Sequence, residues 1–296
     1  MPAASDGRAP GGARFTRFAV ADWSGAKGSR HPGIALAICE TGNAAPVLVD
    51  PPSERYWSRT AVLDWLLAHR DASLLIGFDF SFAPPFILRG SYLPGDPVPV
   101  SATAFHAYVD ALCTDEDLGA ASLLEQHHRR HFYLGAADGP KAGFMHLRRC
   151  EAHYNDAGGG KPSTVYDAIG AAQVAKASFA GMRLLNRLRG KVAVWPFDPV
   201  PEKGAVAVEI YAQIAARATG LRKGLSKIRD PDGLDSALEK LGSRPHLPLA
   251  RYTDHATDAI ITAAWLRANA TRADFWQPPA LTEEIAATEG WTFGVS

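Results

Sequence analysis

The sequence predicts an α/β fold in which helices flank a mixed β-sheet that is interrupted by a large insertion. The first 80 residues follow the order β-β-β-α-β, and residues 73–78 form a nearly continuous apolar run. Such a run is typical of a strand that is covered on both faces. Alternating helix and strand patterns return after residue 166. With 296 residues, of which 47% are hydrophobic, the chain can bury a substantial core.

Three short β-rich runs open the domain, and turn residues bound each of them. These runs cover residues 15–22, 32–39 and 46–49. Gly42 and Asn43 predict a hairpin turn between the second and third strands. Apolar residues then recur at helical spacing over 60–69, and a fourth strand follows at 73–78. The β-β-β-α-β order therefore accounts for the first part of the sheet.

The pattern is irregular over residues 84–163, where several prolines break secondary structure between positions 84 and 99. Helical patches occur only at 102–112 and 120–131. We interpret 84–163 as an insertion or a lid within one domain of residues 15–296. Residues 1–14, rich in Ala, Gly and Pro, are predicted to form a disordered tail.

Regular patterns return in the last part of the chain. Helices are predicted at 166–188, 213–219 and 254–269, strands at 191–195 and 205–210, and a short strand or extended tail at 290–295. The alternation again favours an α/β sheet.

Four acidic residues are associated with these elements. Asp22 and Asp79 end strands, Glu209 lies in a strand and Asp258 lies in the late helix. A right-handed crossover would place the fourth strand beside the first, so that Asp22 and Asp79 meet at the edge where open sheets bind ligands. Crowded carboxylates repel one another, and hard cations such as Mg²⁺ or Mn²⁺ relieve that repulsion. The four acids therefore form a candidate metal site.

His255 precedes Asp258 by three residues and shares its helix face. It is either a ligand or a proton carrier, because its ordinary pKa lies near neutrality. Each acid also has a purely structural alternative. Asp22 can start a turn, Asp79 can cap the chain that follows it, and Glu209 can pair with an arginine. Asp254 is placed as a helix N-cap, and Asp258, one turn later, can favour the helix N-terminus.

The order of these motifs carries a family resemblance. The segments are Val20-Ala21-Asp22-Trp23-Ser24-Gly25, Gly77-Phe78-Asp79, Val208-Glu209-Ile210-Tyr211, His255-Ala256-Thr257-Asp258-Ala259 and Glu289-Gly290-Trp291. From about residue 15 to 295, the chain resembles the family catalogued as domain of unknown function 429, which is regarded as predicted RNase-H-like nucleases. The late helix is also similar to the His-x-x-Asp-Ala pattern of Holliday-junction resolvases of that fold.

The resemblance implies an RNase-H-like fold and a metal-dependent nuclease that hydrolyses phosphodiester bonds of DNA or RNA. It implies Asp22, Asp79, Glu209 and Asp258 as the acidic set, with Mg²⁺ or Mn²⁺ bound. Two departures are the short third strand and the extra chain over 84–163. That extra chain either covers the substrate or blocks a long nucleic acid.

Two other functions stay open at this point. One is a phosphotransferase or other ATP-using enzyme of the related actin-like fold, with Asp22 and the Gly25 turn holding a Mg²⁺-nucleotide. The other is a non-catalytic binding module. Lys plus Arg and Asp plus Glu are both 31, so the formal net charge is zero and there is no overall cationic field to attract nucleic acid. The basic run over 222–229 is the best candidate for phosphate contacts.

Two groups of possible zinc ligands have helical spacings. They are His127, His128 and His131, and His146, Cys150 and His153. Because no C-x-x-C pair accompanies them, a structural role is favoured for both. Three widely spaced cysteines indicate a reducing compartment, and no apolar run approaches the roughly 20 residues of a membrane span. We expect a cytoplasmic protein, and the oligomeric state is not indicated.

Overall fold

The computed structural model describes residues 14–52, 55–160, 162–169, 174–221 and 227–296. The tail predicted over residues 1–14 lies outside this range, apart from Arg14. The guanidinium of Arg14 donates to the carbonyl of Gly204 at 2.7 Å. Arg14 is therefore attached to the folded domain.

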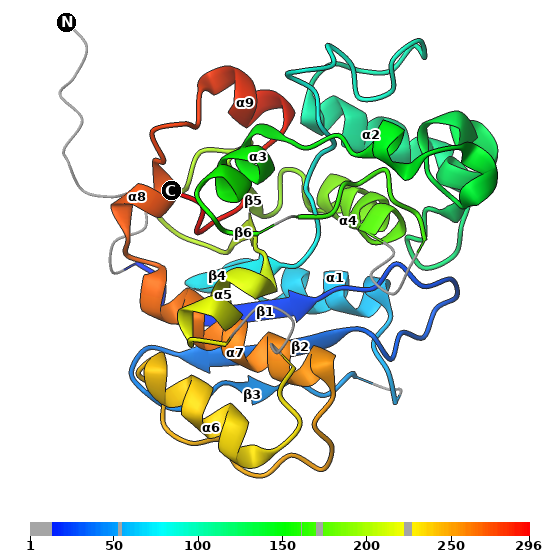
Figure 1. The fold of residues 1–296 in the computed structure, drawn as a ribbon. Helices are drawn as coiled ribbons and strands as arrows, with labels where there is room; N and C mark the ends of the chain where they lie inside the picture. Colours follow the sequence, from blue (N-terminus) through cyan, green and yellow to red (C-terminus); the bar gives the residue numbers. More distant parts are fainter. Residues whose placement is uncertain (1–13, 53–54, 161, 170–173, 222–226) are drawn as a thin grey trace, which may run out of the picture.

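A six-stranded mixed sheet forms the centre of the protein (Figure 1). Its strands, in spatial order, are β3 (Val47–Leu48), β2 (Ala35–Glu40), β1 (Arg17–Asp22), β4 (Leu74–Phe78), β6 (Val206–Glu209) and β5 (Ala193–Trp195). The β1–β2 and β2–β3 pairs are antiparallel, whereas β1–β4, β4–β6 and β5–β6 are parallel. The carboxyl ends of β1, β4 and β6 therefore meet at one edge of the sheet.

Helices cover both faces of this sheet. The helices of the described residues are α1 (Arg59–Ala68), α2 (Ala102–Leu112), α3 (Arg149–Asp156), α4 (Val174–Leu188), α5 (Ala212–Ala218), α6 (Pro231–Lys240), α7 (Asp254–Asn269), α8 (Ala273–Trp276) and α9 (Glu283–Thr288). Alternate residues of β1 point to opposite faces. Phe18 and Val20 pack in one core with α5, α6 and α7, and Ala19 and Ala21 pack in the other with α1 and α4.

The insertion has an apolar core of its own, shared with α4. Phe105 of α2, Phe132 and Phe179 of α4 are fully buried and pack in one cluster. In Figure 1 the insertion, coloured from cyan to green, gathers beside α4. The buried hydroxyl of Tyr92 donates to the carbonyl of Thr288 in α9 at 2.7 Å. The insertion is therefore a packed layer of the domain.

Several predicted elements were wrong in extent or type. Residues 120–131 form a π-helical turn, Leu123–His127, and a 3₁₀ turn, Arg129–His131, in place of a continuous helix. The helix predicted at 166–188 is wrong over residues 166–169, where the backbone at Tyr166 and Ala168 bonds to Tyr133 instead. Residues 170–173 lie outside the described residues, and α4 is described over Val174–Leu188. Helices α3, α6, α8 and α9 were not predicted. Residues 290–295 form no strand, because Thr292 makes only an isolated bridge to Glu209 and a turn follows at Phe293 and Gly294.

Gly181 allows α4 to pack closely against the aromatic ring of Phe80. A Cβ at this position would lie 2.3 Å from a ring carbon of Phe80. We expect Gly181→Ala to lower the free energy of unfolding by about 1–3 kcal/mol through overpacking, despite the better helix propensity of alanine. Urea unfolding measures this loss. Gly143→Ala, where nothing lies within 4 Å of the new methyl group, is the matched control, and equal midpoints for the two variants would contradict the prediction.

Candidate functional site

A pocket of about 570 Å³ opens at the carboxyl ends of β1, β4 and β6. It is lined by residues 22–26, 79–81 and 209–211, which directly follow or end these strands. Helix α7 contributes Asp254, His255 and Asp258, and α3 of the insertion contributes Glu151 and Tyr154. The pocket therefore lies where parallel strands of an open sheet present their ligand-binding edge.

Asp22 ends β1, and the turn after it is held firmly. Arg59, at the start of α1 and 1% exposed, donates to the carbonyls of Ser24 at 2.9 Å and Ala26 at 2.6 Å. Gly25 lies so close to α4 that a Cβ would be 2.4 Å from the backbone nitrogen of Ala177. The indole N–H of Trp23 donates to the Ala177 carbonyl at 3.1 Å. The position of Asp22 is thus fixed by contacts to both α1 and α4.

Asp79 lies next to Asp22 across the β1–β4 pair. Ala21 and Phe78 are register partners, and the backbone N–H of Asp79 donates to the carbonyl of Ala21 at 3.2 Å. Burial raises the pKa of Asp79 well above its ordinary value, and the negative charges of Asp22 and Asp258 raise it further. A backbone N–H of Ala212, at the start of α5, opposes this shift.

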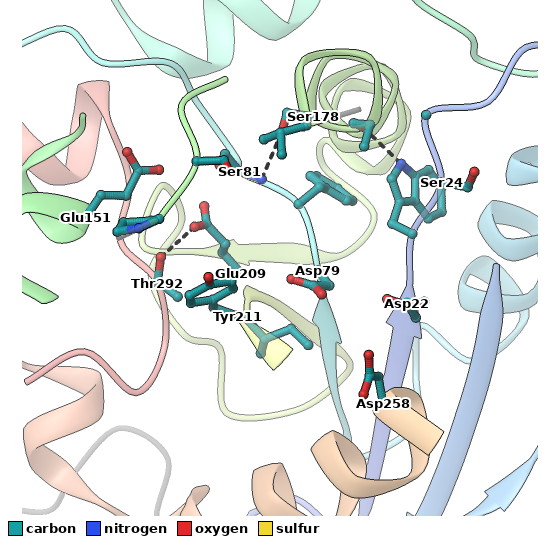
Figure 2. Close-up of a pocket in the computed structure, with 18 of the residues that line it drawn as sticks. Asp22, Ser24, Asp79, Ser81, Glu151, Ser178, Glu209, Tyr211, Asp258 and Thr292 are labelled. Atoms are coloured by element: carbon teal, nitrogen blue, oxygen red, sulfur yellow. Dashed lines mark hydrogen bonds between the residues drawn. The ribbon is translucent and has the colours of Figure 1, made fainter. Parts of the chain in front are cut away.

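Asp258 reaches the same place from α7, which crosses β1 and β2. Burial, followed by the charges of Asp22 and Asp254, raises its pKa to about 7. Burial likewise raises the pKa of Asp22. Among the residues that the structure describes, no arginine or lysine forms an ion pair with Asp22, Asp79 or Asp258. The three acids gather in Figure 2, whereas Glu209 turns toward Thr292.

Asp22, Asp79 and Asp258 are close enough to raise one another's pKa, but their oxygens are not all close enough together to bind one ion. In the described part of the chain, the three potential ligands whose donor atoms all lie within 4.8 Å of one another are Asp96, His128 and His131, in the insertion. The acids at the sheet edge are more widely spaced. Side-chain movement would be needed for all three to share one ion.

His255 forms a pair with Asp22. Its Nδ1 donates to Oδ2 of Asp22 at 2.5 Å, and this bond raises the pKa of His255. The imidazole is 46% exposed, so it can exchange protons with solvent. The neighbouring Asp254 is not the helix N-cap. Thr253 holds that position, and Asp254 forms ion pairs with Lys227 and Arg229.

Glu209 borders the pocket, but its oxygens already have partners. Oε2 accepts from Nη1 of Arg148 and from the backbone N–H of Phe82, both at 2.7 Å. Oε1 accepts from Nη2 of Arg148 at 2.5 Å and from the hydroxyl of Thr292 at 2.6 Å. Glu209 is 3% exposed. Glu209 is therefore paired with an arginine, which is the structural alternative that the sequence left open for it. None of the described arginines pairs with the other three acids.

Sequence reasoning missed Arg148 and Tyr154 as residues of this region. Arg148 also donates from Nε to Oε1 of Glu151 at 2.9 Å, and Glu151 accepts from the backbone N–H of Arg148. The spacing of three between Arg148 and Glu151 before a helix was the available signal. The hydroxyl of Tyr154 is buried and has no hydrogen-bond partner among the described residues. Within the basic run 222–229, residues 222–226 lie outside the described residues, and Lys227 lines the pocket.

No family model matches the chain, and neither the curated proteins nor the solved structures contain a match. The resemblance to the domain of unknown function 429 family therefore stays a prediction. In the described residues, no helix combines the length and apolar character that a membrane span requires. The chemistry of the pocket residues is therefore the basis for a function of this chain.

Proposed function

We propose that this protein is a metal-dependent phosphodiester hydrolase with an RNase-H-like fold. The observation that carries the proposal is the convergence of Asp22, Asp79 and Asp258 from three separate elements, with the pKa of each raised by burial. Burying carboxylates without cationic partners costs free energy. A bound divalent cation would offset this cost and would reverse the pKa shifts.

The sheet topology supports the RNase-H-like part of the proposal. Three antiparallel strands, β1 to β3, are extended by β4 and β6, which run parallel to β1. Asp22 and Asp79 leave neighbouring strands at the carboxyl edge, and α7 brings Asp258 to that edge. The architecture thus delivers acids from segments far apart in sequence.

The donor set fits Mg²⁺ or Mn²⁺, because all three side chains offer hard carboxylate oxygens. Asp22, Asp79 and Asp258 would hold the ions, since the charge of Asp22 acts on both of the other acids. When bound, such ions activate water and stabilise the leaving oxygen of a phosphodiester. His255 is bonded to Asp22 and can move a proton between the pocket and solvent. Glu209 is left out of this set, because Arg148 engages both of its oxygens.

The pocket also favours a substrate class. Its volume of about 570 Å³ lies within the range of about 300–1,000 Å³ found for small-molecule sites. Tyr154 presents a buried hydroxyl without a partner in the described residues, and Lys227 supplies a cation at the rim. With the insertion forming one wall, the pocket suits a short single-stranded stretch of DNA or RNA, or a small phosphodiester, better than a long duplex.

The test is hydrolysis of labelled single-stranded and duplex oligonucleotides and of bis(p-nitrophenyl) phosphate, with Mg²⁺, Mn²⁺ or chelator present. We expect activity only with metal, and Asp22→Asn should lower the rate by roughly 10²-fold or more through lost electrostatic stabilisation. Asp64→Asn, on the exposed side of α1, is the matched control. Equal rates for Asp22→Asn and the unchanged protein would remove the assignment, and ATP binding without hydrolysis of any diester would favour an actin-like enzyme.

A further inference from the structure

A cluster of two histidines and one aspartate lies in the insertion, outside the pocket. Nδ1 of His128 is 2.7 Å, and Nε2 of His131 is 2.9 Å, from the same oxygen, Oδ2 of Asp96. The side chains of both histidines are 8% exposed and that of Asp96 is 18% exposed. A proline- and glycine-containing loop provides the aspartate, and the π-helical and 3₁₀ turns provide the histidines.

Hydrogen bonding alone does not satisfy this cluster. Nε2 of His131 faces both Oδ2 of Asp96, at 2.9 Å, and the Nε donor of Arg130, at 3.2 Å. One ring nitrogen cannot donate to the carboxylate and accept from the guanidinium at once. One of the two contacts is therefore unfavourable in every protonation state. A cation between Nε2 and Oδ2 would attract both the lone pair and the carboxylate, and it would displace the Arg130 guanidinium, which competes for the same lone pair.

The contacts around the two imidazoles resemble those of metal-bound histidines. Nε2 of His128 lies 2.7 Å from the hydroxyl of Tyr108 in α2, so a proton on Nε2 can be donated to that oxygen. A hydrogen bond at Nε2 fixes the orientation of the ring and leaves Nδ1 free to bind a metal, as is usual for metal-bound histidine. Arg130 also pairs with Asp96, but its side chain is 61% exposed and can move away.

We propose that Asp96, His128 and His131 form a zinc site that stabilises the insertion and is separate from the acidic pocket. Two imidazole nitrogens and one carboxylate oxygen suit Zn²⁺, with water as the fourth ligand. Bonds of about 2.0–2.1 Å hold tetrahedral ligands about 3.3 Å apart, so each imidazole has to move back by about half an ångström. The site connects the loop of Asp96 to the His128–His131 turns and, through Tyr108, to α2.

The experiment uses the full chain after chelator treatment and dialysis. Calorimetric titration with Zn²⁺ should show binding that raises the melting temperature, and Co²⁺ should give visible ligand-field bands of a tetrahedral site. His131→Ala should weaken Zn²⁺ binding by about 100-fold or more and abolish the bands. His131→Gln, which keeps most of the volume, should do the same if the alanine variant folds poorly.

His127→Ala is the matched control, because His127 is exposed and lies beside the cluster in sequence. Asp22→Asn is a second control, and it should keep the cobalt bands because the acidic pocket is separate. Excess Mg²⁺ should not compete with Zn²⁺ here. The proposal is overturned if the unchanged protein binds no Zn²⁺, or if His131→Gln and His127→Ala bind it as tightly as the unchanged protein does.

Discussion

Arg148→Ala is expected to lower the free energy of unfolding by about 3–5 kcal/mol, because breaking a buried ion pair leaves an uncompensated charge. Arg148 is 1% exposed and donates to both oxygens of Glu209 and to Glu151. These two carboxylates are themselves buried, at 3% and 6% exposed. Without the guanidinium, both lose their cationic partner and keep only neutral donors, which are the Phe82 N–H and the Thr292 hydroxyl for Glu209 and the backbone N–H of residue 148 for Glu151. Urea unfolding at about neutral pH, with calorimetry as a second probe, measures the loss.

Arg149→Ala is the control for Arg148→Ala, since Arg149 is the adjacent arginine and is exposed. Its effect should stay within about 0.5 kcal/mol. Burial raises the pKa of Glu151 even beside Arg148, so in Arg148→Ala the defect should shrink as the pH falls and this carboxylate takes up a proton. Equal urea midpoints for the two variants would show that the buried network adds no stability.

The pairing of β1 with β4 could be predicted from the sequence, because a general rule on how strands and helices connect favours it. A strand, a helix and a second strand in one sheet connect with a right-handed crossover, which puts Asp79 beside Asp22. The predicted helix over residues 166–188 failed for the opposite reason. Local spacing favours a helix there, but Tyr133 lies more than thirty residues earlier in the chain and takes the backbone bonds at Tyr166 and Ala168. Such long-range competition leaves no periodic signal.

The site was harder to predict, because an acid at a strand end looks the same with or without a cationic partner. Asp79 directly follows β4, and Glu209 ends the parallel strand β6 opposite Phe78, yet among the described residues only Glu209 has an arginine partner. That arginine comes from the insertion, 61 positions away in sequence. Asp96 is likewise 32 positions from His128, in a loop with no regular pattern. Histidine spacing alone therefore favoured a structural role for His128 and His131 over a metal site.

Asp258→Asn is expected to stabilise the metal-free protein at about pH 8 by an amount on the order of 2 kcal/mol. The pKa of Asp258 is raised to about 7, whereas an unfolded aspartate titrates near about 3.9. A carboxyl group with a raised pKa supports the fold while it is protonated, and this contribution is lost as the pH rises through the folded pKa. Above about pH 7, the ionised carboxylate therefore costs stability, and the neutral amide avoids that cost.

Asp258→Asn should also remove a metal ligand. The variant should therefore be more stable than the unchanged protein without metal, but it should gain less stability from added metal. Thermal unfolding without metal should place Asp258→Asn above the unchanged protein at about pH 8 and level with it below about pH 4. Added Mg²⁺ or Mn²⁺ should raise the melting temperature of the unchanged protein and change that of the variant much less. Asp64→Asn should follow the unchanged protein throughout. If Asp258→Asn is destabilised without metal, then Asp258 has an attractive partner in the fold, and the crowding of acids that supports a cation site is absent.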